Sequence, residues 1–266
     1  MESHKLQPRG DDMKLIILNC DCGEGIGDDA AILPHVGAAN IACGGHAGDA
    51  ATMRATLRLC KQLGVSAGAH PGYPDREHFG RKVLPMSPAE VQATVLAQIQ
   101  SLDAVAKDEG VALAHVKPHG ALYNHAAVMP AIADAIAGAI VQHDKTLALV
   151  GLAGSALVDA GARHGLRVVG EAFADRAYEV GGALRDRSLA GALIEDDAQC
   201  LAQVLRIAQR GEVIAHDGSV VKIDAQTICL HSDTANAARR AAFLREHLSQ
   251  HGIVPGTMSL ADRSKA

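Results

Sequence analysis

Aromatic side chains are scarce in this sequence of 266 residues, which contains 3 Phe, 3 Tyr and no Trp. A surface on which nucleic-acid bases stack needs such rings, so the composition argues against one. Positive charge is not in excess either, because 25 Lys and Arg residues face 30 Asp and Glu residues, for a formal net charge of -5. Phosphate binding requires a basic surface, and we therefore expect no nucleic-acid partner.

Long apolar runs are also missing. No uninterrupted stretch approaches the roughly 20 residues of a transmembrane helix, and residues 1–12 lack the apolar stretch of a signal peptide. We expect a cytoplasmic protein with no membrane partner. The 6 cysteines fit neither a zinc ribbon nor a secreted disulfide framework, so we expect buried, reduced thiols. The C-x-C spacing of Cys20 and Cys22 could still bind a soft metal.

What the sequence does contain is an alternation of short apolar runs with longer helical patterns. The runs that predict strands are 14–18, 38–43, 65–69, 112–116, 147–151, 168–172 and 227–230. The helical patterns cover 49–63, 87–109, 129–143, 155–164, 195–210 and 234–251. This alternation is typical of parallel sheets with right-handed crossovers. We predict an α/β fold, an incomplete TIM-like barrel of seven strands, with a doubly wound open sheet as the competing arrangement.

A single domain is expected. Hydrophobic residues make up 48% of the chain, enough for a sizeable core, and no Pro-, Gly- or Ser-rich linker interrupts it. We assign 1–12 to a flexible N-terminal extension, 13–252 to a single barrel domain and 253–266 to a C-terminal tail. Two stretches without a clear pattern, 71–85 and 175–194, are long for connections in a compact domain, and such loops are often functional.

Polar residues follow almost every predicted strand. Sites in parallel α/β folds form at the carboxyl ends of the strands. Residues two apart on a strand share a face. The sets that share a face in this way are Asn19 with Asp21, His115 with Lys117 and His119, and His231 with Asp233. We expect these side chains to converge at the mouth of the barrel.

Each of these residues also has a structural explanation. A single buried His is more often a core residue than a catalyst, and for His115 the two explanations are equally supported. Asp49 and Asp233 stand where helix N-caps are expected, and Ser87 begins a capping box. Six strand ends with ionisable groups would be costly in a purely structural barrel, since buried charge must be paired. We therefore favour an active site.

Motifs for nucleotide and metal binding are incomplete or absent. The run Gly23–Gly27 does not complete G-x-G-x-x-G, and Asp28 and Asp29 after it would repel phosphate. The sequence has no P-loop, H-E-x-x-H or G-x-S-x-G motif. Ligands from different strands could still bind a divalent metal. Lys117 would oppose such a cation unless it were neutral or turned away, so metal binding stays open.

Seven segments together resemble the LamB/YcsF family over residues 13–252. They are NCDCGEGIGDD at 19–29, ANIACGGHAGD at 39–49, GAHPGYPD at 68–75, FGRK at 79–82, HVKPHGALYN at 115–124, FADRAY at 173–178 and ICLHSD at 228–233. Gly45 stands where the family usually has a larger, often aromatic residue, and Ser232 stands where Gly is common. Both departures could change the shape of the pocket, but they remove no ionisable group.

The resemblance implies a barrel related to the glycoside hydrolase/deacetylase superfamily. It also implies ATP-dependent opening of 5-oxoproline to glutamate, together with two other 5-oxoprolinase subunits. ATP with Mg²⁺ would then be the cofactor, bound by this chain in an unfamiliar way or mainly by the partner subunits, because the chain lacks a P-loop. We predict that the isolated chain has little or no 5-oxoprolinase activity. The sequence leaves a homo-oligomer open.

This reaction assigns roles to the polar residues. Opening an unstrained lactam requires a positioned water or an activated acyl group, a general base, and positive charge on the developing oxyanion. The candidate catalytic residues are Asp21, Glu24, His46, His70, Lys117 and His119. The candidate substrate-binding residues are Asn19, Asn40, Tyr73, Arg81, Tyr123, Glu171, Asp175, Arg176 and His231. The candidates for the general base are Asp21, Glu24 and His46. The candidates that hold the substrate carboxylate or the oxyanion are Lys117, His119 and Arg176. The candidates that orient these cationic side chains are Glu171 and Asp175.

Two other interpretations compete with this one. The first is a self-sufficient, metal-dependent hydrolase or deacetylase acting on a C–N bond, which predicts a bound divalent ion and loss of activity with a chelator. The second is a non-catalytic scaffold protein, which predicts that His70→Ala leaves the activity of the complex unchanged. The density of acids and histidines at the strand ends disfavours the scaffold.

Overall fold

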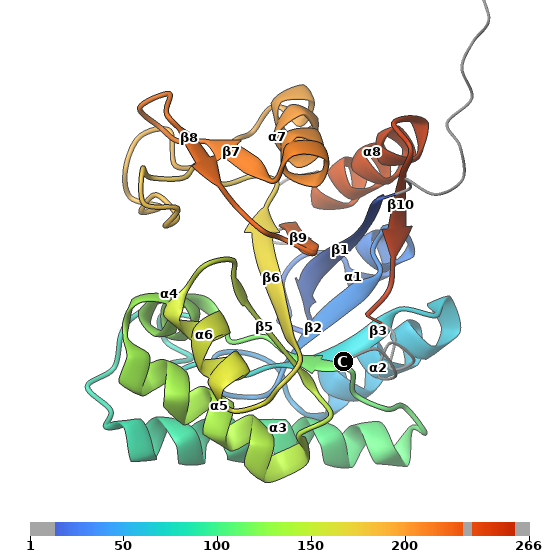
Figure 1. The fold of residues 1–266 in the computed structure, drawn as a ribbon. Coiled ribbons are helices and arrows are strands. Elements are labelled where there is room, and N and C mark those ends of the chain that lie inside the picture. The colour runs from blue at the N-terminus through green and yellow to red at the C-terminus, as the bar shows by residue number, and fades with distance from the viewer. Residues whose placement is uncertain (1–13, 231–235, 259–266) are drawn as a thin grey trace, which may run out of the picture.

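The computed structural model describes residues 14–230 and 236–258, and Figure 1 shows their arrangement. Within these residues, seven parallel strands form a closed barrel. They are β1 (Lys14–Cys22), β2 (Ala38–Ala42), β3 (Ser66–His70), β4 (His115–Val116), β5 (Ala148–Leu152), β6 (Val168–Phe173) and β9 (Thr227–Leu230). Strand β9 pairs with both β6 and β1, which closes the ring. The predicted seven-stranded TIM-like barrel is confirmed, and the open sheet is excluded.

Helices surround the barrel in Figure 1. Those of the described residues are α1 (Asp29–Ile32), the 3₁₀ helix η1 (Leu33–His35), α2 (Ala50–Leu63), α3 (Pro88–Asp108), α4 (Gly120–Val128), α5 (Pro130–Asp144), α6 (Ala156–Arg163), α7 (Asp197–Arg210) and α8 (Ala237–Gln250). The six predicted helices are present, whereas α1, η1 and α4 were not predicted. No single helix in the described ranges combines the length and apolar character needed to cross a membrane. In these ranges, only α4 and α5 meet both requirements when they are counted together, and this pair is bent by 117°.

Two helices next to the site begin at the caps that the sequence predicts. The Asp49 carboxylate accepts a hydrogen bond from the Thr52 backbone N–H, and Thr52 Oγ1 accepts one from the Asp49 N–H. Ser87 and Glu90 form the same reciprocal pair at the start of α3. Each cap satisfies backbone donors that have no partner within the helix, so α2 and α3 start at defined residues after β2 and β3.

The boundary predicted at residue 252 is wrong. Residues Ile253–Gly256 form an eighth parallel strand, β10, which pairs with the first half of β1, while β2 pairs with its second half. Close packing at this point requires glycine, because a Cβ on Gly37 would lie 1.8 Å from the Gly256 carbonyl oxygen. The barrel domain therefore extends beyond residue 252, and the predicted 1–12 extension lies outside the described residues.

The interior of the barrel changes from apolar to polar along the strands. A buried apolar cluster at the amino ends contains Ile17, Ala38, Ala114, Ala148, Val150, Val169 and Met258. Met258 follows β10, and its carbonyl accepts a hydrogen bond from Ser66 Oγ at 3.0 Å. Since side chains alternate along a strand, the next inward positions after Ile17 are Asn19 and Asp21. Apolar residues therefore fill the barrel at the amino ends of the strands, and polar residues lie at the carboxyl ends.

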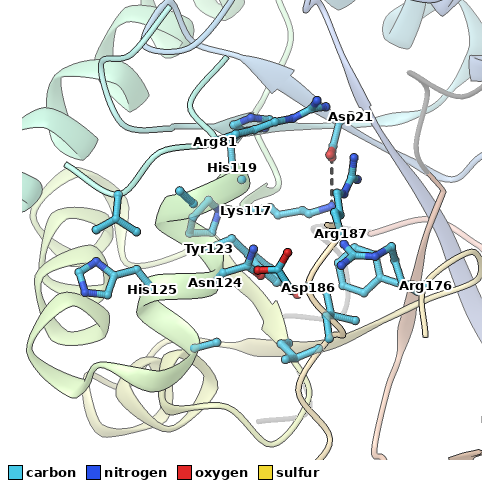
Figure 2. A pocket seen from close by; sticks show the side chains of 18 of the residues that line it. Asp21, Arg81, Lys117, His119, Tyr123, Asn124, His125, Arg176, Asp186 and Arg187 are labelled. Carbon is cyan, nitrogen blue, oxygen red and sulfur yellow. Dashed lines mark hydrogen bonds and ion pairs between the residues drawn. The ribbon is translucent and has the colours of Figure 1, made fainter. Parts of the chain in front are cut away.

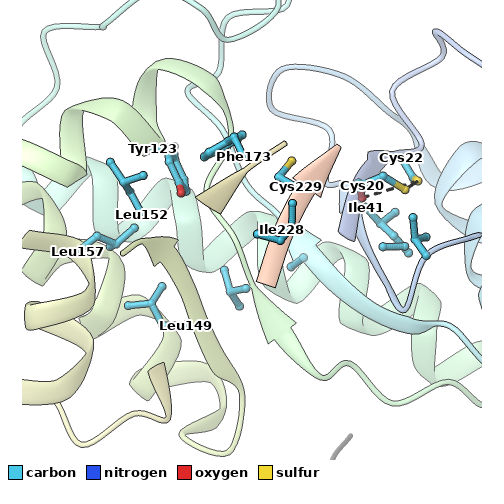
Figure 3. Packing of buried hydrophobic residues seen from close by; sticks show 14 of the residues in the cluster. Cys20, Cys22, Ile41, Tyr123, Leu149, Leu152, Leu157, Phe173, Ile228 and Cys229 are labelled. Atoms are coloured by element: carbon cyan, nitrogen blue, oxygen red, sulfur yellow. Dashed lines mark hydrogen bonds between the residues drawn. The ribbon is translucent and has the colours of Figure 1, made fainter. Parts of the chain in front are cut away.

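A larger apolar cluster fills the space between the barrel and its helices. Figure 3 shows part of it, with Cys20 and Cys22 side by side and their Sγ atoms 3.2 Å apart. All 6 cysteines are buried and free, as predicted. The hydrogen bond with the Cys20 thiol, and then burial, raise the pKa of Cys22, which disfavours the thiolate that a soft metal needs.

The long segment after β6 has more structure than the sequence predicts. It forms isolated bridges between Arg176 and Leu193 and between Tyr178 and Leu184. A further bridge joins Tyr178 to Ala215, next to an antiparallel hairpin of β7 (Glu212–Ile214) and β8 (Val220–Lys222). Segment and hairpin lie together beyond the end of β6 (Figure 1). This places residues 176–193 over the carboxyl end of the barrel.

Candidate active site

A network of buried polar side chains crosses the barrel from β1 to β6. Asn19 donates to Glu171 Oε1 at 2.9 Å, and Asn40 donates to Asp21 Oδ1 at 2.8 Å. Lys117, which follows β4, places its Nζ 3.0 Å from both Asp21 Oδ1 and Glu171 Oε1. The shared face inferred for Asn19 with Asp21 is confirmed here, because both side chains join this network. The set of His231 with Asp233 lies outside the described residues.

The Lys117 ammonium is fully engaged in this network. Besides the two carboxylates it lies 3.3 Å from Asn19 Oδ1 and 3.1 Å from Cys229 Sγ. Burial opposes its charged form, but Asp21, Cys229 and Glu171 outweigh this and raise the pKa of Lys117 well above its usual value. An ammonium has three protons to donate. Lys117 therefore holds the two carboxylates in place.

Next to this network, three imidazoles face one carboxylate. Glu24 Oε1 lies 3.1 Å from His46 Nε2, 3.4 Å from His119 Nδ1 and 3.9 Å from His70 Nε2. The His70 and His119 nitrogens are themselves 3.0 Å apart. The His46 and His119 rings are stacked, with centroids 3.6 Å apart and planes at 4°. All four side chains are buried.

Burial and neighbouring charges shift the pKa values of these three histidines in different directions. Burial, reinforced by His70, lowers the pKa of His46 to about 3. Burial also lowers the pKa of His119 well below its usual value. For His70, burial acts in the same direction, but the Asp21 carboxylate outweighs it and raises the pKa. At neutral pH His46 and His119 are therefore neutral, and His70 is the member that most readily takes a proton.

A cavity of about 620 Å³ opens above both groups (Figure 2). Asp21, Glu24, His70, Lys117 and His119 form its polar floor. Its apolar walls are Phe79, Val83, Ala127, Val128, Leu152, Phe173 and Leu184. Its basic rim is Arg81, Arg176, Arg185 and Arg187. The cavity thus combines buried acid–base groups with guanidinium groups, which suits a small anionic ligand.

The structure brings most of the predicted site residues together. Those that line the cavity are Asp21, Glu24, His70, Arg81, Lys117, His119, Tyr123 and Arg176. Those that lie behind its floor, bonded to floor residues, are Asn19, Asn40, His46 and Glu171. Two others lie away from it: Tyr73 is buried with its hydroxyl 2.7 Å from His125 Nδ1, and Asp175 is buried 4.0 Å from Arg240. The prediction for His231 lies outside the described residues.

The sequence did not point to several residues that line the cavity or contact its floor. Asn124 and His125 line the wall, and the signal was their place at and just after the end of the HVKPHGALYN segment. Cys229 contacts Lys117, and as an inward residue of β9 it could have been found by alternation. Asp186 and Arg187 carried no usable signal, because the long segment after β6 has no periodicity to show which residues face inward.

Glycines make room for several of these groups. A Cβ on Gly68 would lie 2.2 Å from His115 Nε2, and His115 uses that space to reach Asn40 Oδ1 at 2.8 Å. At Gly45 the space is taken by the Gln98 side chain, which would be 2.3 Å from a Cβ. Gln98 bonds the Gly72 backbone through both its amide atoms. The space that a larger residue at position 45 would occupy is therefore filled by Gln98, which supports the loop after β3.

Comparison with known proteins relates more than nine-tenths of the chain to one group. The chain is 59% identical over 250 residues to the 5-oxoprolinase A subunit of Chloroflexus aggregans, covering 92% of this chain and 99% of that protein. It is 55% identical over 246 residues to the protein of the same name from Chloroflexus aurantiacus, covering 91% and 97%. A lactam utilization protein of Thermus thermophilus superposes with a TM-score of 0.86 at 43% identity, covering 91% and 99%. A sequence profile of the LamB/YcsF family matches residues 16–262, and the chain belongs to that family.

Proposed function

We propose that this chain is the A subunit of a 5-oxoprolinase and carries the residues that open the lactam ring of 5-oxo-L-proline to give L-glutamate. The observation that carries the proposal is the identity of 55–59% with proteins of that name over more than nine-tenths of the chain. The cavity supports it independently, because it places carboxylates and imidazoles below a basic rim. That arrangement suits hydrolysis of a small, negatively charged amide.

The carboxylate of 5-oxoproline fits between Arg176 and Arg187. Burial, and then the nearby Arg187 charge, lower the pKa of Arg176. The Arg176 side chain is buried, donates to the Arg185 carbonyl at 2.6 Å, and has no partner for its Nε among the described residues. The unpartnered Nε of Arg176 and the positive charge of Arg187 nearby favour a carboxylate at this place. The ring of the substrate then lies against Phe173 and Leu184.

Asp21 is the general base in this proposal. Its Oδ1 is held by Asn40 and Lys117, so the carboxylate has a defined direction. It removes a proton from a water molecule, whose oxygen bonds to the lactam carbon. The ring C–N bond then breaks, and the nitrogen takes up a proton as it becomes the amine of glutamate. Lys117, with its protons engaged, acts by positioning Asp21 rather than by binding the substrate.

ATP is handled by the partner subunits in this proposal. The lactam has little strain and a poor leaving group, so its hydrolysis near neutral pH needs coupling to ATP. The sequence has no P-loop, and the floor of the cavity carries carboxylates that would repel phosphate. We therefore place the reaction in the cytoplasm, where ATP is available, in a complex with two further subunits.

Reconstitution tests the proposal. The purified chain is incubated with 5-oxoproline and ATP, alone and with the two partner subunits, and glutamate release is measured. We expect turnover only in the complex, and a loss in kcat of about 100-fold or more for Asp21→Asn, the usual contribution of a general base. Asp75→Asn, a partly buried acid bonded to His78 outside the cavity, is the matched control and should retain turnover. Turnover by the chain alone, or an unchanged kcat in Asp21→Asn, would overturn this assignment.

A further inference from the structure

In His70 and His119, one ring nitrogen (the outer one) contacts a backbone carbonyl, and the other (the inner one) faces the second histidine. The hydrogen bond of the outer nitrogen determines whether the inner nitrogen donates or accepts. His70 Nδ1 lies 2.7 Å from the Lys117 carbonyl, and His119 Nε2 lies 2.9 Å from the Phe79 carbonyl. A carbonyl only accepts, so both outer nitrogens carry hydrogen. In neutral rings the inner nitrogens are then acceptors. These two lone pairs face each other across 3.0 Å beside the Glu24 carboxylate, an arrangement that needs a positive species between them.

The spacing of these three acceptors matches a metal site. The distances among His70 Nε2, His119 Nδ1 and Glu24 Oε1 are 3.0, 3.4 and 3.9 Å. Metal bonds of about 2.0–2.2 Å place neighbouring ligands of a tetrahedral zinc ion about 3.4 Å apart. The two rings stand at 87° to each other, so their in-plane lone pairs can meet at one point. Backbone carbonyls on the outer nitrogens are also the usual support for metal-bound imidazoles.

His46 belongs to the same cluster but not to this ligand set. Its Nε2 is close enough to the other atoms to be a ligand by distance alone. Its ring, however, is parallel to that of His119 at 3.6 Å, and one ion cannot lie in both ring planes. Unlike His70, His119 and Glu24, it does not line the cavity. Its position 3.1 Å from Glu24 Oε1 suits a hydrogen-bond donor to that carboxylate.

We propose that His70, His119 and Glu24 bind one divalent transition-metal ion of the zinc type, with its open coordination positions facing the cavity. Two imidazoles and one carboxylate favour such an ion over Mg²⁺ or Ca²⁺, which prefer oxygen ligands. The Lys117 ammonium contacts Asp21 Oδ1, whereas Asp21 Oδ2 faces His70 at 3.4 Å. The carboxylate therefore separates the ammonium from the ion. The inference concerns metal binding alone and does not depend on the substrate.

Metal binding is measured directly on the full chain without substrate. The protein is stripped with a chelator, dialysed and titrated with Zn²⁺ by calorimetry, with metal content determined by elemental analysis. We expect one Zn²⁺ per chain. His70→Gln and His119→Gln should each weaken binding by about 100-fold or more, and His46→Gln, as an outer partner, by about 10–100-fold. The matched control is His125→Gln, a cavity histidine bonded to Tyr73, which should bind as the unmodified chain does.

Two results with the variants would overturn the proposal. The first is Zn²⁺ uptake by the unmodified chain no greater than that of the His70→Gln/His119→Gln double variant. That result would mean that a proton, and not a metal ion, lies between the two histidines. The second is a loss in His46→Gln as large as that in His70→Gln. Substitution with Co²⁺ provides a measurement that needs no variant. Visible bands without thiolate charge transfer support the site, whereas thiolate bands would place the ion at Cys20 and Cys22 instead.

Discussion

Removal of the Lys117 ammonium tests how the floor of the cavity is held together. The Lys117 and Glu171 side chains are 3% and 0% exposed, with Nζ and Oε1 3.0 Å apart. In Lys117→Met the Glu171 carboxylate keeps the Asn19 amide as a hydrogen-bond donor but loses its counter-charge and cannot reach water. Breaking a buried ion pair in this way costs about 3–5 kcal/mol of unfolding free energy. Asp21, the other carboxylate, has a side chain that is 14% exposed and can be hydrated instead.

The double variants identify which carboxylate carries the penalty. Adding Glu171→Gln to Lys117→Met neutralises the buried acid and should recover about 1–3 kcal/mol, the range of coupling between residues in direct contact. Adding Asp21→Asn should recover less. Urea unfolding followed by circular dichroism, with a chelator present throughout, gives the free energies. A cost below about 1 kcal/mol for Lys117→Met, or equal recovery by the two second substitutions, would refute the reasoning.

Two further substitutions test local packing and capping. Gly68→Ala puts a methyl group against the His115 ring and should cost about 1–3 kcal/mol, seen as a lower melting temperature. Gly181→Ala, which meets nothing within 4 Å, should stay within about 0.5 kcal/mol, and an equal effect at both sites would contradict the steric argument. Asp49→Ala removes the carboxylate that caps α2 and should cost about 1 kcal/mol, whereas an unchanged urea midpoint would show that the Thr52 pair contributes nothing.

Most of the barrel could be predicted because its signals are local. Apolar runs of four to six residues identified the seven barrel strands, and the capping pair at Ser87 identified the start of α3. Strand β10 could not be predicted in the same way, because its four residues include Pro255 and become a strand only by pairing with β1. The segment after β6 was likewise unpredictable, since its bridges join residues without a periodic pattern.

The candidate site was predictable in part for the same reason. Alternation along β1 assigned Asn19 and Asp21 to one face, and parallel strands bring their carboxyl ends to one side. Tyr73 shows where this reasoning fails. It stands in one of the segments most typical of the family, yet its hydroxyl turns to His125 instead of the cavity. Once the chain leaves a strand, the direction of a side chain depends on contacts with segments that are distant in sequence.

The sequence by itself therefore determined the fold class, the strand ends at which chemistry gathers, and the strand faces on which Asp21 and Lys117 lie. Only the tertiary structure decided which atoms meet, such as the imidazole nitrogens of His70 and His119 at 3.0 Å. It also decided that the Lys117 ammonium contacts the Asp21 and Glu171 carboxylates. The physical reason is that periodicity specifies a direction within one strand. Distances between strands follow from the register of the closed barrel and from carbonyls, such as that of Phe79, supplied by loops.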